Sequence, residues 1–356
     1  MAAAAAAGGR SRSRSRGRPR SQPWALAVAA GLAVCAFYYL GGGGGQSAAR
    51  ASPRASAAPP RALHLLAMLT RAERAPALRD KARAALRSLL RHGRPRGGAA
   101  LHLHLVTDGA SRELGLALLR DLLRGAALRH QVIVHDVNEL TEKLFPIVEA
   151  MQKHFSAGLG TYYSDSIFFL SVAMHRIMPK EITQIIQVDL DLKYKANIQD
   201  LFDEFDNFPE GAVIGIAREM QPVYRHTFWQ YRRENPQTKV GDPPPDGLPG
   251  FNSGVLLLNL EAMRQSKLYN QLLEPAMVQK LTEKYHFKGH LGDQDFFTMV
   301  GMEHPELFHV LDCTWNRQLC TWWRDHGYSD VFDQYFQCEG EVKIYHGNCN
   351  TPIPED

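Results

Sequence analysis

Two aspartates at the end of an apolar segment are the residues with the clearest chemical potential in this sequence. In residues 187–191 (QVDLD), one leucine separates Asp189 from Asp191. Strand side chains alternate between faces, so an extended segment points both carboxylates the same way. Two carboxylates this close repel each other unless a proton or a cation lies between them. The pair is therefore a candidate site for a divalent cation that also holds a diphosphate, although strand-end acids produce the same triplet by chance.

Three later segments carry small or polar residues of the kinds that ligand sites use. They are FNSG at 251–254 (Asn252, Ser253, Gly254), HLGDQD at 290–295 (Asp293, Gln294, Asp295) and HGNCN at 346–350 (His346). Glycine lets a backbone approach a ligand closely. Each segment also has a structural explanation, as a tight turn, a helix cap and a hydrogen-bonded histidine respectively.

Alternating strands and helices must position these side chains. Apolar runs predict strands at 62–70, 101–107, 131–137, within 181–192 and at 212–217; helical spacing predicts helices at 79–91, 114–123 and 164–178, the last capped by Ser164. This order is typical of parallel strands with ligands at their carboxyl ends. Residues 241–250 must form a loop, and 251–260 is expected to be a turn leading into a buried strand. No GxGxxG follows the first strand and no GxxxxGK[ST] occurs, which disfavours dinucleotide-dehydrogenase and P-loop functions.

Charge is distributed unevenly along the 356 residues. Residues 1–60 contain eight arginines and no acid, residues 61–100 carry a net charge of +8, and residues 101–356 carry −12. The last region would repel a phosphate backbone unless its bases were clustered, and no cluster is present in the sequence. Nucleic-acid binding is therefore excluded as the leading interpretation.

The amino terminus has the pattern of a membrane-targeting segment. Residues 24–40 are largely apolar and uncharged, and six arginines precede them. This predicts a cytosolic arm at 1–22, a transmembrane signal anchor at 23–43, a flexible stem at 44–60 and a luminal domain at 61–356. The alternative is a cleaved secretory signal. Either arrangement delivers most of the chain to the secretory lumen.

Cysteine usage agrees with a luminal domain. Apart from Cys35 in the apolar segment, the cysteines are confined to the last 44 residues: Cys313, Cys320, Cys338 and Cys349. No CxxC pair is present, so two disulfides that staple the carboxy-terminal tail are expected rather than a zinc site. Four cysteines allow three pairings, and their spacing does not choose among them. We take Cys313–Cys338 with Cys320–Cys349 as a working assumption.

The order of the motifs resembles that of the metal-dependent retaining glycosyltransferases of family 8, which include glycogenin and bacterial galactosyltransferases. A strand ending in DxD is followed by FNSGVLLLN, then GDQD, then a late HGN histidine. The resemblance covers residues 61–350 and implies an α/β GT-A fold, with a Rossmann-like mixed sheet flanked by helices. The tail LDCTWN…CTWWRD…YHGNCN and the short anchor resemble in particular those members of the family that transfer xylose.

Those members transfer xylose from UDP-xylose in α1,3 linkage onto xylose-glucose O-glycans of EGF-like repeats, such as those of Notch. The resemblance thus implies a single-pass type II protein of the endoplasmic reticulum membrane, with the Golgi as the alternative. Transfer from UDP-glucose or UDP-galactose, or non-catalytic binding of a nucleotide sugar, remain alternative functions.

The resemblance also assigns roles to individual residues. Asp189, Asp191 and His346 are implied to be the metal ligands, and two carboxylates with one imidazole favour Mn²⁺ over Mg²⁺. Further donor-binding roles are implied for Met68, Leu69 and Thr70 at uridine, Leu190 at ribose, Asn252, Ser253 and Gly254 at the sugar, Gly347 and Asn348 at the diphosphate, and Asp293 and Asp295 at sugar hydroxyls.

The resemblance places Gln294 opposite the leaving group, and an amide is a poor nucleophile. We therefore expect a front-face mechanism, in which Gln294 stabilises positive charge at the anomeric carbon. Xylose lacks the hydroxymethyl group of glucose, so bulky residues must fill that space; His290 and Leu291 are the candidates. Trp322 and Trp323 are candidates for acceptor binding, with core packing as the alternative. His290 and Leu291 are also candidates for acceptor binding. The arginine-rich helix at 79–91 is expected to be a solvated face.

Overall fold

The computed structural model describes residues 61–156 and 166–355. The predicted arm, anchor and stem at 1–60 lie outside the described residues, and so does Ser164, the expected helix cap. Within the described ranges, none of the helices combines the length and the apolar character needed to cross a bilayer.

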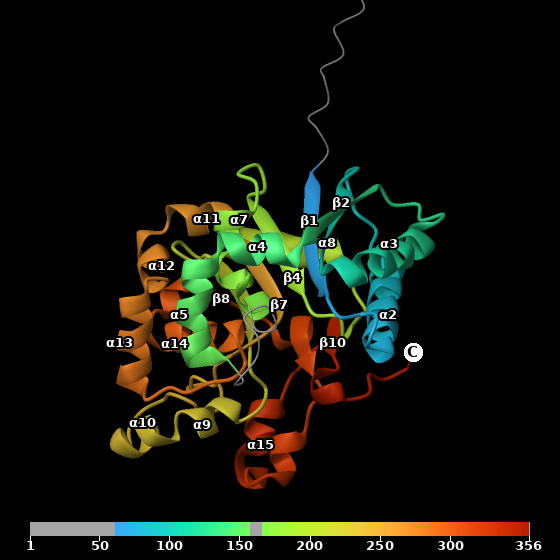
Figure 1. Ribbon diagram of the computed structural model, residues 1–356. Coiled ribbons are helices and arrows are strands. Elements are labelled where there is room, and N and C mark those ends of the chain that lie inside the picture. Colours follow the sequence, from blue (N-terminus) through green and yellow to red (C-terminus); the bar gives the residue numbers. More distant parts are fainter. Residues whose placement is uncertain (1–60, 157–165, 356) are drawn as a thin grey trace, which may run out of the picture. The chain divides into compact units, whose positions relative to one another are not determined.

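A seven-stranded mixed sheet forms the centre of the fold (Figure 1). Its strand order is β3-β2-β1-β4-β7-β6-β8, and β7 runs antiparallel to both of its neighbours while the other strands are parallel. The bounds are β1 Ala62–Leu69, β2 Ala100–Thr107, β3 His130–Asp136, β4 Gln184–Val188, β6 Ile214–Arg218, β7 Phe251–Asn259 and β8 Phe308–Leu311. The mixed sheet expected from the sequence is confirmed.

Helices cover both faces of this sheet. The α-helices are α2 Pro76–His92, α3 Gly109–Leu123, α4 Val137–Lys143, α5 Phe145–Phe155, α7 Met174–Ile177, α8 Ile198–Asp203, α9 Val223–Thr227, α10 Trp229–Glu234, α11 Leu260–Gln265, α12 Lys267–Leu272, α13 Pro275–Tyr285, α14 Asp293–Glu303 and α15 Ser329–Phe336. Leu65 packs with α2 and α3 on one face, whereas the next residue, Leu66, packs with α5, α13 and α14 on the other. Figure 1 shows these two groups of helices on opposite sides of the sheet. Burial on both faces explains the nearly continuous apolar runs of the strands.

Two local predictions were wrong. The expected helix at 164–178 is broken, from residue 167 on, into two 3₁₀ segments, Ile167–Phe169 and Ser171–Ala173, followed by the short α7. Residues 251–254 form no turn, because the whole segment from Phe251 is strand β7. Its antiparallel direction carries the beginning of β7 to the carboxyl end of β4, where the Asp189 amide donates to the Gly254 carbonyl at 2.9 Å.

A small second sheet holds the carboxy-terminal tail against the first. Its order is β5-β10-β9, with β5 Leu192–Tyr194, β9 Arg317–Gln318 and β10 Ile344–His346. His346 pairs with Leu192 across β10 and β5, so the tail histidine lies beside the residue that follows Asp191. Disulfides join Cys313 to Cys338 and Cys320 to Cys349 in this region.

Arg264 stabilises the connection that leads into β4. Its guanidinium donates to five backbone carbonyls, those of His175, Met178, Pro179, Lys180 and Ile182, at 3.1–3.4 Å. These carbonyls lie at the end of α7 and in the turn after it, where a helix leaves its last acceptors unpaired.

We expect Arg264→Lys to lower the free energy of unfolding by about 2 kcal/mol, because an ammonium cannot reach all of these carbonyls at once. Urea unfolding followed by tryptophan fluorescence measures the loss. Arg176→Lys is the control, since Arg176 makes one hydrogen bond to Asn270. Equal losses in the two variants would contradict this role of Arg264.

Candidate functional site

Three candidate metal ligands from two sheets meet at one point. Asp189 follows β4, Asp191 precedes β5 and His346 ends β10. One ligand atom from each lies within 4.8 Å of the others. His346 Nε2 is 3.3 Å from Asp191 Oδ1 and 3.6 Å from Asp189 Oδ2. Two carboxylates and one imidazole at these separations fit a divalent cation.

The approach of His346 to the acids requires a glycine in β7. A Cβ built on Gly254 would lie 2.4 Å from Cε1 and 2.7 Å from Nδ1 of the His346 ring, which is closer than real Cβ contacts. Gly254 thus leaves room for the ring of a candidate metal ligand.

The charges of the three side chains balance one another. Burial raises the pKa of Asp191, but the hydrogen bond and charge of His346, together with Lys81, hold that pKa below its ordinary value. Burial lowers the pKa of His346, but Asp191, Asp189 and Glu219 outweigh it and raise that pKa. A metal ligand must be deprotonated, so a divalent cation and a proton on His346 would compete for this site.

An open cavity of about 450 Å³ is lined by two of these ligands, Asp189 and Asp191. Several residues predicted to bind the donor line it together with Asp189 and Asp191: Met68, Thr70, Leu190, Ser253, Asp293, Gln294 and Leu291. Leu291 and Phe168 also line an adjoining cavity of about 260 Å³, whose wall includes His290. The two cavities therefore meet at Phe168 and Leu291.

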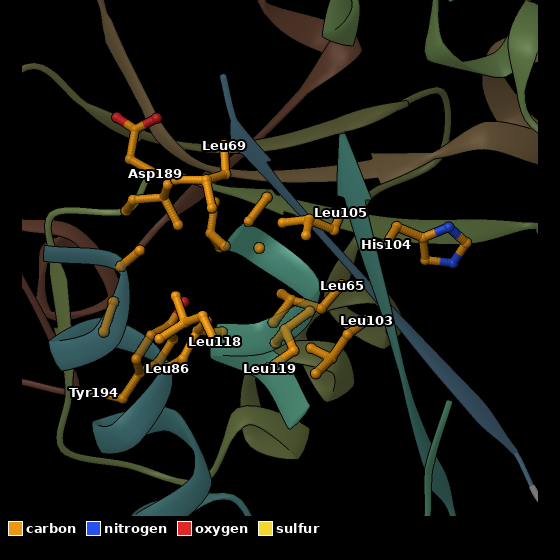
Figure 2. Close-up of a pocket in the computed structure, with 16 residues that line it drawn as sticks. Leu65, Leu69, Leu86, Leu103, His104, Leu105, Leu118, Leu119, Asp189 and Tyr194 are labelled. Atoms are coloured by element: carbon orange, nitrogen blue, oxygen red, sulfur yellow. The ribbon is translucent and has the colours of Figure 1, made fainter. Parts of the chain in front are cut away.

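Other predicted donor-binding residues lie behind the cavity wall. Leu69 faces the apolar side of β1, where Figure 2 shows a small gap among leucines of β1, β2, α2 and α3, with the Asp189 carboxylate pointing away from it. Asn252 is buried, and the Asn348 side chain accepts hydrogen bonds from the amides of Leu319 and Cys320. Gly254 and Gly347 contribute backbone, and the Gly347 amide donates to the Asp191 carbonyl at 2.8 Å.

The tryptophans proposed for acceptor binding are not among the described residues that line these cavities. Trp322 is half exposed and stacks on His326 with ring centroids 3.6 Å apart. Trp323 packs on His226 at 5.0 Å and is partly buried. A third tryptophan of the tail, Trp315, is buried in the core and donates to Glu204 at 3.0 Å.

The residues of the GDQD segment form the first turn of α14. Ser171 and Ser253 hydroxyls donate to the two oxygens of Asp293 at 2.6 and 3.0 Å. Asp295 accepts from the Tyr224 hydroxyl and the Leu291 amide, so it supports the cavity wall. The Ser253 amide donates to Gln294 Oε1 at 3.2 Å, which places Gln294 beside the acids in the cavity.

Sequence reasoning missed three polar residues around this site. Of the described residues that line the cavity, only Lys81 carries a positive side chain; its Nζ is 3.5 Å from Asp191 Oδ2 and 2.8 Å from Asn350 Oδ1. The sequence does place Lys81 on the same helix face as Leu78, one turn earlier, and both residues line the cavity. Glu219 and Asn316 are buried and belong to no motif that spacing could reveal.

Gly254→Ala should weaken binding of Mn²⁺ at least about tenfold, because the added methyl group displaces the His346 ring from the acids. Isothermal titration with MnCl₂ measures the affinity. Gly109→Ala is the matched control, since its methyl group would meet no atom within 4 Å. Unchanged affinity in Gly254→Ala would show that His346 is not a ligand.

Asp293 should make the stability depend on pH near neutrality. Burial raises its pKa from 3.8 to about 7, so the folded protein takes up a proton there that the unfolded chain does not. The free energy of unfolding of the wild type, relative to Asp293→Asn, should therefore rise by about 1 kcal/mol from pH 8 to pH 6. Urea unfolding in EDTA measures this, and the exposed Asp206→Asn should show no such trend.

Comparisons with known proteins agree with this geometry. The pattern described as Glycosyl transferase family 8 matches residues 84–346. Human xyloside xylosyltransferase 1 is 66% identical over 368 residues, covering 93% of this chain and 94% of that protein. Mouse xylosyl- and glucuronyltransferase LARGE2 is 30% identical over 62% of this chain and 28% of its own length.

A solved structure shows the same fold. The crystal structure of mouse xyloside xylosyltransferase 1 in its apo form is 73% identical, with a TM-score of 0.79, and the match covers 82% of this chain and all of that chain. The family pattern spans well over half of the 356 residues and includes the acid pair, Gln294 and His346. The chain therefore belongs to glycosyltransferase family 8.

Proposed function

We propose that this protein is a retaining xylosyltransferase that moves xylose from UDP-xylose in α1,3 linkage onto the xylose of xylose-glucose O-glycans on EGF-like repeats, such as those of Notch. One observation carries the proposal: the three candidate metal ligands lie together, and two of them, Asp189 and Asp191, line the same cavity as Gln294. The names of the human and mouse relatives support xylose as the sugar. The linkage and the acceptor rest on the motif resemblance.

Asp189, Asp191 and His346 would hold Mn²⁺, whose charge, when bound, stabilises the leaving diphosphate. Lys81 supplies a second positive charge beside Asp191, suited to a phosphate oxygen. Met68 and Thr70 border the cavity at the end of β1, where the uracil and ribose would bind. This arrangement supports a UDP-sugar donor on a GT-A fold.

Gln294 supports a front-face route. Both oxygens of Asp293, its acidic neighbour, already accept serine hydroxyls, which makes that carboxylate a poor nucleophile. The bond from the anomeric carbon to UDP breaks, and the acceptor oxygen bonds to the same face of the sugar. The acceptor proton passes to the leaving phosphate oxygen, while the amide oxygen of Gln294 stabilises the positive charge that develops on the sugar.

The proposed location is the membrane of the endoplasmic reticulum, with the anchor at 23–43 in the bilayer and the catalytic domain in the lumen; the Golgi is the alternative. The two disulfides of the tail support an oxidising compartment. Glycosylated EGF-like repeats of secreted or cell-surface proteins are the proposed partners.

A donor panel tests the reaction. With an EGF repeat that bears xylose-glucose, transfer from UDP-xylose should exceed transfer from UDP-glucose and UDP-galactose by at least about tenfold, and NMR of the product should show an α1,3 linkage. Asp191→Asn should abolish Mn²⁺-dependent transfer while the protein stays folded. Faster transfer from UDP-glucose would overturn the donor assignment, and absence of UDP release with any donor would indicate a non-catalytic binder.

A further inference from the structure

A buried carboxylate lies directly behind Gln294. Glu219 follows β6 and is 3% exposed. Its Oε2 accepts from Gln294 Nε2 at 3.3 Å and from Asn252 Nδ2 at 3.0 Å. Its Oε1 is buried and has no hydrogen-bond partner among the described residues. Glu219 does not line the donor cavity, so any effect on the reaction must pass through the residues that it contacts.

The amide of Gln294 is held at both ends. The Ser253 amide donates to its oxygen at 3.2 Å, and its nitrogen donates to Glu219. Gln294 lines the cavity, and its amide oxygen is the atom that faces the sugar in the proposed mechanism. A hydrogen bond from the amide nitrogen to an ionised carboxylate draws electron density toward the amide oxygen, because linked hydrogen bonds polarise one another.

A carboxylate is a costly choice for holding two amides. A neutral glutamine could accept the same two hydrogen bonds, whereas ionising a buried carboxylate costs free energy, which the nearby charge of His346 offsets only in part. Burial raises the pKa of Glu219 to about 7, which reflects that cost. Destabilising charges of this kind occur where function requires them.

We propose that Glu219 is a positioning residue for sugar transfer, whose negative charge acts through Gln294 to make the amide oxygen a stronger stabiliser of the positive anomeric carbon. This inference rests on the proposed function. It concerns the rate of the chemical step, so kcat should depend on the charge while KM for the donor should not. It also explains why the acid is retained despite its cost to stability.

The charge can be removed without removing the hydrogen bonds. Glu219→Gln should lower kcat at least about tenfold with little change in KM, measured with whichever UDP-sugar the wild type uses fastest. Its thermal midpoint at pH 8 should equal or exceed that of the wild type, because a buried charge is lost. If Glu219 has only a structural role, Glu219→Gln should instead lower the thermal midpoint. Its kcat should then fall only in proportion to the fraction of protein that remains folded.

Glu303→Gln is the matched control, because Glu303 also accepts from two side chains, Lys284 and Tyr285, but at the far end of α14. The pKa of Glu303 is lowered, so this variant should lose a little stability and keep its kcat. The same substitution should matter less when Gln294 is absent. Adding Glu219→Gln to Gln294→Ala should lower kcat by less than about threefold, because the charge then has no amide through which to act.

A second pair keeps the test decisive if Glu219→Gln fails to fold. Glu219→Asp and Glu219→Asn leave the same gap and differ only in charge, so the Asp variant should turn over at least about fivefold faster. Equal kcat values in this pair, or an unchanged kcat in Glu219→Gln, would overturn the inference while leaving xylose transfer intact. If the wild type releases no UDP from any donor, the inference and the proposed function both fail.

Discussion

Repulsion between two neighbouring carboxylates is the constraint on which this site depends. Asp189 and Asp191 flank one leucine at the end of a central strand, and their negative charges require a counter-charge. The fold places two positive groups within reach, the imidazole of His346 and the ammonium of Lys81, and the three candidate ligands lie close enough together to fit a divalent cation. A site that is stable only with positive charge present is suited to binding a metal together with an anionic diphosphate.

The direction of one strand determines what surrounds that acid pair. Because β7 runs antiparallel to β4, its first residues rather than its last ones lie beside Asp189. Ser253 then reaches both Asp293 and Gln294 on α14, and Gly254 leaves space for the His346 ring. A parallel β7 would place Asn259 at this position and would break all of these contacts.

Whether a site residue could be predicted depends on whether a short stretch of sequence around it reveals its role. Asp189 and Asp191 form a local pattern, because strand alternation alone places both on one face. His346 lies 155 residues after Asp191, so only the motif resemblance linked it to the acids. Lys81 shares a helix face with Leu78, but several arginines of the same helix are equally good candidates for a positive side chain in the site. Only the packing of α2 decides which of these residues faces the site. Glu219 and Asn316 carry no periodic signal, because buried hydrogen bonds to distant residues leave no spacing in the chain.

The sequence by itself determined the α/β alternation, the apolar strands and the acid pair, since these follow from side-chain burial and short-range geometry. It also determined which four cysteines were available in the tail. Tertiary structure alone decided the antiparallel placement of β7, the pairing of β10 with β5, and the contact of Glu219 with Gln294. Those features depend on contacts between residues far apart in the chain, whose free energies exist only once the whole domain has packed.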